Sequence, residues 1–174
     1  MNKALFLDRD GVINKEKNYL YKIDDFEFID GVFETCRYFQ EIGYLIFVIT
    51  NQAGIARAKY TENDFNILNK WMIEKFSKEN IKIIEVYHCP HHPDYSKECD
   101  CRKPKPKMIL DAKKKFNIDL KKSILVGDKN TDIEAGINAS VGTNYLVSTG
   151  HKISENKFNV KILNNLIELK DDFE

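Results

Sequence analysis

Short runs of apolar residues alternate along the chain with segments in which apolar residues recur at helical spacing. Near-continuous apolar runs are typical of strands that are covered on both faces of a sheet. These runs predict strands at residues 3–8, 45–50, 83–89, 123–128 and 143–148. The segments between them predict helices at residues 32–42, 61–79, 106–117 and 130–139. The tail, residues 156–174, predicts a last short strand and a helix.

The helix predicted at residues 61–79 has the clearest start signal. Thr61 and Asp64 have the spacing of a capping box, in which each residue satisfies a backbone N–H of the other. The regular alternation of strands and helices predicts an α/β protein with a doubly wound parallel sheet. We expect one domain over residues 1–174, with ligands bound at the carboxyl ends of the strands.

Composition limits the class of protein further. Lys and Arg together number 27, as do Asp and Glu, so the chain lacks the positive field that collects nucleic acid. No apolar run approaches the roughly 20 residues that span a bilayer, and charged residues come too early for a secretory signal. We therefore expect a cytoplasmic protein without a nucleic-acid or membrane partner. Separately, we expect a monomer that acts on a small molecule.

Carboxylates and hydrogen-bond donors follow the ends of three predicted strands. Asp8 and Asp10 follow the first strand, Thr50 and Asn51 the second, and Asp128 the fourth. Because the carboxyl ends of parallel strands meet at one edge, these groups are expected to share one rim. Oxygen ligands with room for water and phosphate favour Mg²⁺. A turn with solvated charges would explain Asp8 and Asp10 taken alone. It does not explain why suitable polar residues follow three different strands.

Such a rim supports phosphoryl transfer to a carboxylate. Asp8 would attack phosphorus and become esterified, which splits one hard displacement into two easier steps. Asp10 would give a proton to the leaving oxygen and then take one from the attacking water. Mg²⁺, held by Asp8, the backbone carbonyl of Asp10 and Asp128, would offset the repulsion between nucleophile and phosphate. Catalysis is therefore expected to depend on Asp8, Asp10 and this metal.

Further residues can support the same step. Thr50 and Asn51 can donate hydrogen bonds to the transferring oxygens, and Lys103 can neutralise them as a point charge. Asp132 follows Asp128 by one helical turn, which favours a role in orienting Lys129 or a metal-bound water over direct ligation. A purely helical role for Asp132 stays open, because a carboxylate is favoured in a first helical turn.

Cysteines and histidines are dense in residues 88–103. Thiols stay reduced in the cytoplasm, so clustered cysteines favour a metal over disulfides. Tetrahedral Zn²⁺ could be held by four ligands, Cys89, His91, Cys99 and Cys101. A closed four-ligand site leaves no position for substrate, so this zinc would be structural and would fix the chain before Lys103. His88 and His92 compete with His91 as the fourth ligand, and reduced cysteines without a metal remain the alternative.

The blocks DRDGVIN, VITNQAGIAR, CPHHP…CDCRKPKP and ILVGDKNTDIEAG resemble the signature blocks of the haloacid-dehalogenase-like (HAD) phosphatases. Their order and the cysteine-rich insert are similar to those of the D-glycero-D-manno-heptose 1,7-bisphosphate 7-phosphatase family. The resemblance implies a Rossmann-like HAD fold, catalytic Mg²⁺, and structural Zn²⁺ with His91 as its ligand. It also implies that the C7 phosphate of a heptose bisphosphate is removed to give heptose 1-phosphate, a precursor of ADP- or GDP-heptose for lipopolysaccharide or another surface glycan.

The resemblance also implies which residues bind substrate. Arg102 would read the substrate and Lys129 would lie beside it. Two further segments would line the pocket, namely Glu16, Lys17, Asn18 and Tyr19, and Thr50, Asn51, Gln52 and Ala53. Two residues depart from the usual pattern, because Ala53 stands where Ser is common and Lys107 where Gly is common. The first departure removes one candidate hydrogen bond to the substrate, and the second adds a cation.

The spacing of the blocks leaves no room for a cap domain, since about 40 residues separate Asp8 from Thr50. Histidinol-phosphate phosphatases share the same blocks and are the alternative. A DNA 3′-phosphatase would need a basic groove, and a zinc-stabilised binding module with an inert rim would release no phosphate. Outside the rim, Cys36 is expected in the core and His151 on a surface loop without a partner.

Overall fold

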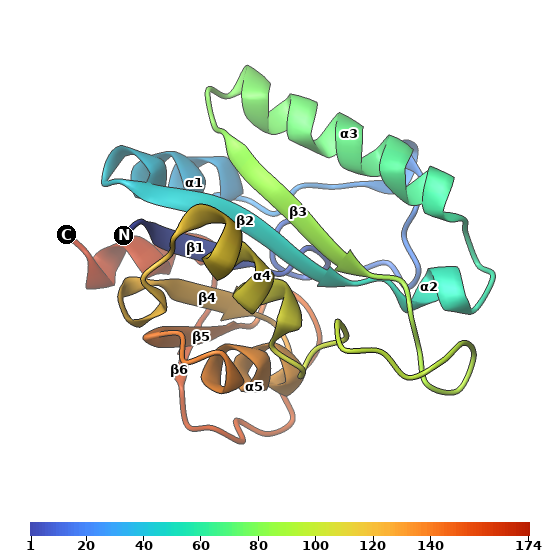
Figure 1. Ribbon diagram of the computed structural model, residues 1–174. Helices are drawn as coiled ribbons and strands as arrows, with labels where there is room; N and C mark the ends of the chain where they lie inside the picture. Colours follow the sequence, from blue (N-terminus) through green and yellow to red (C-terminus); the bar gives the residue numbers. More distant parts are fainter.

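The computed structural model describes residues 1–174, and its centre is a six-stranded sheet in the order β3-β2-β1-β4-β5-β6 (Figure 1). All neighbouring strands are parallel. The strands are β1 (Lys3–Leu7), β2 (Tyr44–Asn51), β3 (Ile83–Cys89), β4 (Ile124–Gly127), β5 (Thr143–Val147) and β6 (Lys161–Leu163). The five predicted strands are confirmed, and β6 is the short strand expected in the tail. Because β1 is central, its carboxyl end has neighbours on both sides.

Helices cover both faces of the sheet (Figure 1). The predicted helices are confirmed as α1 (Val32–Glu41), α3 (Glu62–Lys78), α4 (Lys107–Phe116) and α5 (Asn130–Asn138). A short helix that was not predicted, α2 (Ala53–Ala56), follows β2 directly. Three 3₁₀ helices complete the chain, η1 (Ile23–Asp25), η2 (Leu120–Lys122) and η3 (Leu166–Asp172), so the helix expected in the tail has 3₁₀ rather than α geometry.

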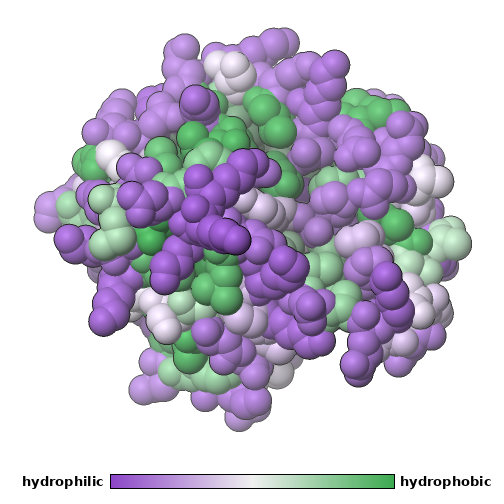
Figure 2. Space-filling model, viewed as in Figure 1, coloured by the Kyte–Doolittle hydropathy of each residue, from purple (hydrophilic) through white to green (hydrophobic).

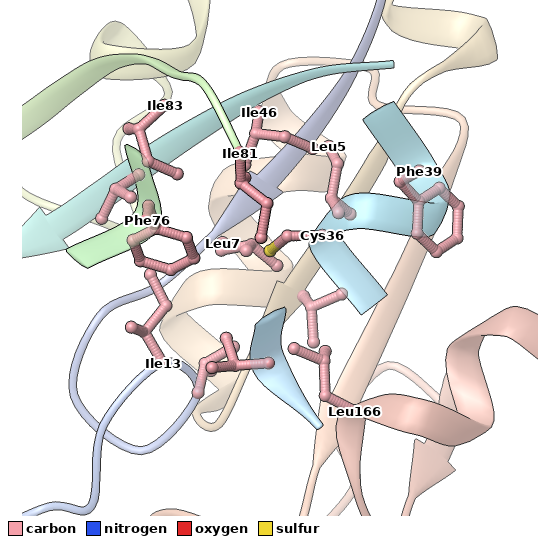
Figure 3. Packing of buried hydrophobic residues seen from close by; sticks show 14 of the residues in the cluster. Leu5, Leu7, Ile13, Cys36, Phe39, Ile46, Phe76, Ile81, Ile83 and Leu166 are labelled. Carbon is pink, nitrogen blue, oxygen red and sulfur yellow. The ribbon is translucent and has the colours of Figure 1, made fainter. Parts of the chain in front are cut away.

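The side chains of β1 alternate between two cores because successive residues of a strand point to opposite faces. Leu5 and Leu7 pack with α1, α3 and η3, whereas Ala4 and Phe6 pack with α4 and α5. Figure 3 shows the first of these cores, in which Cys36 lies between Leu7 and Phe39. Cys36 is a core residue as predicted, and burial raises the pKa of its thiol to about 12.

Helix α3 begins with the predicted capping box. The Thr61 hydroxyl accepts from the backbone N–H of Asp64 at 3.1 Å, and the Thr61 N–H donates to the Asp64 carboxylate at 2.8 Å. Two of the otherwise unpaired donors at this end are thereby satisfied, which fixes where the helix starts. The start matters for the site, because it sets the length of the loop that links α2 to α3.

No further domain is inserted beside the sheet. The connection from β1 to β2 contains only η1 and α1, and the connection from β2 to β3 contains only α2 and α3. The absence of a large cap domain is thus confirmed. The face in Figure 2 mixes polar and apolar side chains. No helix combines the length and apolar character that crossing a membrane requires.

Candidate active site

The predicted rim forms at the carboxyl ends of three adjacent strands. Asp8 follows β1, Thr50 lies near the end of β2, and Asp128 follows β4, and all three are buried. The backbone N–H of Asp8 donates to Val126 of β4 at 3.1 Å, which continues the sheet pairing into the site. The register of parallel strands therefore brings these side chains together, as the sequence predicted. With Lys103 and Asp132 they form what we call the polar floor.

Lys103 lies at the centre of the polar floor and is 3% exposed. Its ammonium is 2.9 Å from Asp8 Oδ1 and 2.7 Å from Asp132 Oδ1, and it donates to the Ile49 carbonyl at 2.8 Å. Burial lowers the pKa of Lys103, but the two carboxylates outweigh this effect and the pKa is raised above its usual value. Lys103 is therefore a fixed positive charge beside Asp8.

Asp8 lies in an environment that disfavours its charged form. Burial is the largest effect and raises the pKa of Asp8 well above its usual value. Lys103 lowers that pKa, while the neighbouring carboxylates of Asp132 and Asp128 raise it. The floor thus holds more negative charge than Lys103 alone compensates, and a bound cation would relieve this excess.

Asn51 holds the segment that carries Lys103. Its side chain donates to the Lys103 carbonyl at 3.2 Å and accepts from the Lys103 backbone N–H at 3.0 Å. This reciprocal pair joins the end of β2 to a loop that is 52 residues away in sequence. The structure gives the Asn51 amide a role in positioning Lys103, and its predicted hydrogen bond to the transferring oxygens stays a prediction.

Asp10 lies at the edge of the floor and is held by three donors. Arg9 is 3.0 Å from its carboxylate, Asn14 Nδ2 donates at 3.0 Å, and Gln52 Nε2 donates at 3.1 Å. Although burial raises the pKa of Asp10, the Arg9 charge and these hydrogen bonds outweigh it and leave the pKa below its usual value. Gln52 also donates to Thr50 at 2.8 Å and accepts from Tyr60, so one side chain links Asp10 to β2.

Asp132 and His151 both act on the Asp128 region. Asp132 Oδ2 accepts from the backbone N–H groups of Asp128 at 3.1 Å and Lys129 at 3.0 Å, so Asp132 does orient the Lys129 backbone. The sequence named no partner for His151, and the structure supplies one. Its backbone N–H donates to Asp128 Oδ2 at 2.8 Å and its Nδ1 is 2.6 Å from the same oxygen. The loop after β5 folds back over β4, which sequence spacing could not show.

The floor fits a hard cation. Oxygens of Asp8, Asp128 and Asp132 all lie within 4.8 Å of one another. Asp128 Oδ1 is buried and has no hydrogen-bond partner. A buried carboxylate oxygen without a donor is costly unless an ion satisfies it. The carboxylate of Asp10 is engaged by Arg9, Asn14 and Gln52 and lies outside this group, and its backbone carbonyl as a metal ligand stays a prediction.

A cavity of about 360 Å³ opens above the floor. Most predicted site residues line it, namely Asp8, Asp10, Glu16, Asn18, Tyr19, Thr50, Asn51, Gln52, Ala53, Arg102, Lys103 and Lys129. Lys17 does not line it, because its ammonium pairs with Glu27 at 2.7 Å. The structure therefore does not bring Lys17 to the site.

Further residues line the cavity that the sequence did not indicate, namely Leu20, Gly54, Arg57, Tyr60, His92, Thr131 and His151. Helix α2 is only four residues long, which is too short for apolar periodicity to reveal it. Tyr60 reaches the cavity because Gly54 has no side chain, since a Cβ there would lie 2.1 Å from the Tyr60 ring. The close approach of Tyr60 to Gly54 would have indicated that Tyr60 faces the cavity, but this contact can be recognised only once the fold is known.

The sulfurs of Cys89, Cys99 and Cys101 lie within 4.8 Å of one another, and Cys89 Sγ is 3.5 Å from Cys99 Sγ. All cysteines are free thiols. Three soft ligands around one point fit zinc. The ring of His91 is not in this group, and its backbone carbonyl accepts from Arg102 at 3.4 Å. The assignment of His91 as fourth ligand stays a prediction.

The rival histidines have other contacts. His88 pairs with Glu62 and stacks on Phe65 at 4.1 Å between ring centroids, which takes it away from the sulfurs. His92 lines the cavity, and its Nδ1 accepts from the backbone N–H of Asp94 at 3.2 Å. Neither histidine is in the thiol group.

Comparisons with known proteins give the family. A profile of the HAD-hydrolase-like family matches residues 100–167. A D-glycero-α-D-manno-heptose-1,7-bisphosphate 7-phosphatase of Campylobacter jejuni is 55% identical, over 86% of this chain and 85% of that protein. A phosphatase of the same name from Photorhabdus laumondii is 48% identical, over 96% of this chain and 94% of that protein. The chain belongs to this family of HAD-like heptose-bisphosphate phosphatases.

Other members of the heptose-bisphosphate phosphatase family differ in the named anomer. A D-glycero-β-D-manno-heptose-1,7-bisphosphate 7-phosphatase of Escherichia coli K12 is 44% identical over 95% of this chain and 91% of that protein. Among solved structures, the heptose-bisphosphate phosphatase of B. bronchiseptica, complexed with magnesium and phosphate, has a TM-score of 0.88 and 25% identity. That alignment covers 98% of this chain and 97% of the other, so the whole fold is shared.

Proposed function

We propose that this protein removes the C7 phosphate of D-glycero-D-manno-heptose 1,7-bisphosphate and releases heptose 1-phosphate. The product would supply ADP- or GDP-heptose for lipopolysaccharide or another surface glycan, in the cytoplasm and with the protein as a monomer. The observation that carries the proposal is the buried Asp8 carboxylate beside Lys103, at the base of a cavity that also contains Asp10. Relatives at 44–55% identity that bear this activity in their names support the substrate.

The reaction would proceed in two displacements. An Asp8 oxygen attacks the C7 phosphorus, the bond from phosphorus to the sugar oxygen breaks, and Asp10 gives that oxygen a proton. Water then attacks the aspartyl phosphate while Asp10 takes a proton from it, which frees phosphate and restores Asp8. The donors that lower the pKa of Asp10 suit the second step. Approach of the substrate phosphate would raise that pKa and so favour the first.

The floor supplies the fixed charges for both displacements. Lys103 points at Asp8, and Thr50 lies on the neighbouring strand with its hydroxyl available to the transferring oxygens. We propose that Asp8, the Asp10 carbonyl and Asp128 hold Mg²⁺, in keeping with the magnesium of the B. bronchiseptica structure. When bound, the ion supplies positive charge that offsets the repulsion between carboxylate and phosphate.

The walls of the cavity would bind the sugar and its second phosphate. Arg102 and Lys129 supply positive charge, and Glu16, Asn18, Tyr19, Gln52 and Ala53 supply polar and apolar contacts. We propose structural zinc at Cys89, Cys99 and Cys101 with His91 as the fourth ligand. Only Arg102 separates Cys101 from Lys103, so a metal at the thiols would fix the backbone that carries both cations.

The decisive experiment compares Asp8→Asn with the unchanged protein on purified α and β heptose 1,7-bisphosphate and on histidinol phosphate. We expect magnesium-dependent phosphate release from a heptose bisphosphate, at a rate at least about 10³-fold lower in Asp8→Asn because no carboxylate can attack. Asp111→Asn, on the exposed surface of α4, is the matched control and should keep full activity. Retained turnover in Asp8→Asn, or faster release from histidinol phosphate, would contradict the proposal.

A further inference from the structure

Arg57 is a cation of the cavity that has no acidic partner. It follows α2, lines the cavity, and was not indicated by the sequence. Lys103 is neutralised by Asp8 and Asp132, whereas no carboxylate forms an ion pair with Arg57. Its guanidinium donates to one protein atom, the Tyr95 hydroxyl at 3.1 Å, and its Nε is buried without a partner. Most of its five N–H donors are therefore free to bind a ligand.

Aromatic rings from two other segments hold Arg57 in place. The guanidinium carbon lies 4.3 Å from the ring centroid of Tyr95, which belongs to the cysteine-rich loop. It lies 5.8 Å from the ring of Tyr19, which belongs to the loop after β1. We call Tyr19, Arg57 and Tyr95 the Arg57 clamp. A side chain that is already fixed by two rings gives up less conformational freedom when it binds an anion.

The clamp and the floor lie at different depths of the cavity. Asp8, Thr50 and Lys103 are buried, while Arg57 is half-buried and Tyr95 is 55% exposed. A substrate with one phosphate at the floor would place its far end toward the opening. A planar guanidinium with free parallel donors can form bidentate hydrogen bonds to a phosphate, which a lysine ammonium cannot do.

We propose that Arg57 binds the phosphate of the substrate that is not hydrolysed, and so selects sugar bisphosphates over monophosphates. This inference rests on the proposed function, because it requires a second phosphate at the far end of the sugar. Arg57 is a binding residue here and takes no part in bond breaking. Tyr19 and Tyr95 act through Arg57 by holding its guanidinium.

The test measures kcat and KM for two substrates that share the C7 phosphate, heptose 1,7-bisphosphate and heptose 7-phosphate. Arg57→Ala should raise KM for the bisphosphate about 10- to 100-fold, since it removes charge-assisted hydrogen bonds, and should leave kcat nearly unchanged. For heptose 7-phosphate both constants should stay within about threefold. The preference of the unchanged protein for the bisphosphate should therefore collapse.

Two further variants separate binding from folding. Arg57→Lys keeps the charge and should recover part of the preference, while Tyr95→Phe keeps the ring but loses the hydroxyl and should raise KM for the bisphosphate less than Arg57→Ala does. Arg37 is a surface arginine that pairs with Glu79, so Arg37→Ala is the matched control. It should leave kcat and KM unchanged for both substrates. Thermal melting of each variant checks that the fold is intact.

The outcomes distinguish the inference from the proposed function. If the unchanged protein hydrolyses the bisphosphate and Arg57→Ala slows both substrates equally, or changes neither, the inference is wrong and the proposed function stands. If the unchanged protein shows no preference for the bisphosphate, the inference is likewise wrong. If it hydrolyses neither substrate, the proposed function fails, and the inference fails with it.

Discussion

The polar floor and the loops above it hold their polar groups by different means. Asp8, Thr50 and Asp128 lie at the ends of neighbouring strands, so the backbone pairing of the sheet sets their spacing. The loops lie outside the paired strands, and apart from isolated backbone bridges they are held by side-chain contacts, such as Arg57 with Tyr95 or Lys17 with Glu27. The difference implies that the spacing of the floor carboxylates depends on the sheet, to which Asn51 ties Lys103, whereas substrate binding depends on side-chain contacts between loops.

The largest effect is expected when the floor loses its cation. Lys103→Met keeps most of the length of the side chain but leaves Asp8 and Asp132 buried without a positive partner. Removing one member of a buried ion pair costs about 3–5 kcal/mol of unfolding free energy. Turnover should also fall by at least about 10²-fold, because the charge beside the nucleophile is lost.

Urea unfolding and steady-state kinetics measure both effects of Lys103→Met. Lys107→Met is the control, since Lys107 pairs only with Asp111 on the exposed side of α4. Activity of Lys103→Met within tenfold of the unchanged protein would mean that turnover does not need the cation beside Asp8, and the role given to Lys103 would be wrong.

A smaller effect is expected in the cysteine-rich loop. Cys99→Ser removes one of the three gathered thiols, so it should lower the melting temperature by several degrees and abolish the response of melting to a zinc chelator. Magnesium dependence should persist, because the floor does not use this sulfur. Differential scanning fluorimetry with and without chelator makes the measurement.

Cys36→Ala is the control for Cys99→Ser, because Cys36 lies in the hydrophobic core and is not one of the three gathered thiols. Its baseline stability should change while its chelator response remains. If the unchanged protein melts at the same temperature with and without chelator, the thiols do not hold a structural metal.

The smallest effect is expected at Lys17. Because its ammonium pairs with Glu27 rather than lining the cavity, Lys17→Ala should leave kcat/KM within about twofold for the heptose bisphosphate. Steady-state kinetics beside Arg57→Ala would show the contrast between a loop cation that lines the cavity and one that does not. A loss above tenfold at Lys17 would show that the loop rearranges when substrate binds.

Most of the fold could be predicted because apolar runs and caps are local signals. Buried strands, the capping box of α3 and the carboxylates at strand ends depend on neighbouring residues in sequence, and the structure agrees with them. Helix α2 could not be found because four residues carry no period. The 3₁₀ geometry of η3 is a similar case, since an apolar pattern at the end of a chain does not separate the two helix types.

The missed parts of the site depend on contacts across the chain. His151 reaches Asp128 only because the loop after β5 folds over the end of β4, a contact that spans 23 residues. Asn51 grips Lys103 across 52 residues. Arg57 lines the cavity because of where α2 directs the chain. Sequence spacing could identify the strand-end chemistry, but it could not show which loop side chains turn toward that chemistry.

The central position of β1 has a consequence for how such a protein changes over time. With β2 on one side and β4 on the other, the backbone at Asp8 is anchored by paired strands on both sides. During evolution, substitutions in the segments around Tyr19, Arg57 and Tyr95 would change which sugar is bound, while the residues that remove the phosphate are kept. Changes in substrate specificity would therefore arise at the opening of the cavity and not at its catalytic base.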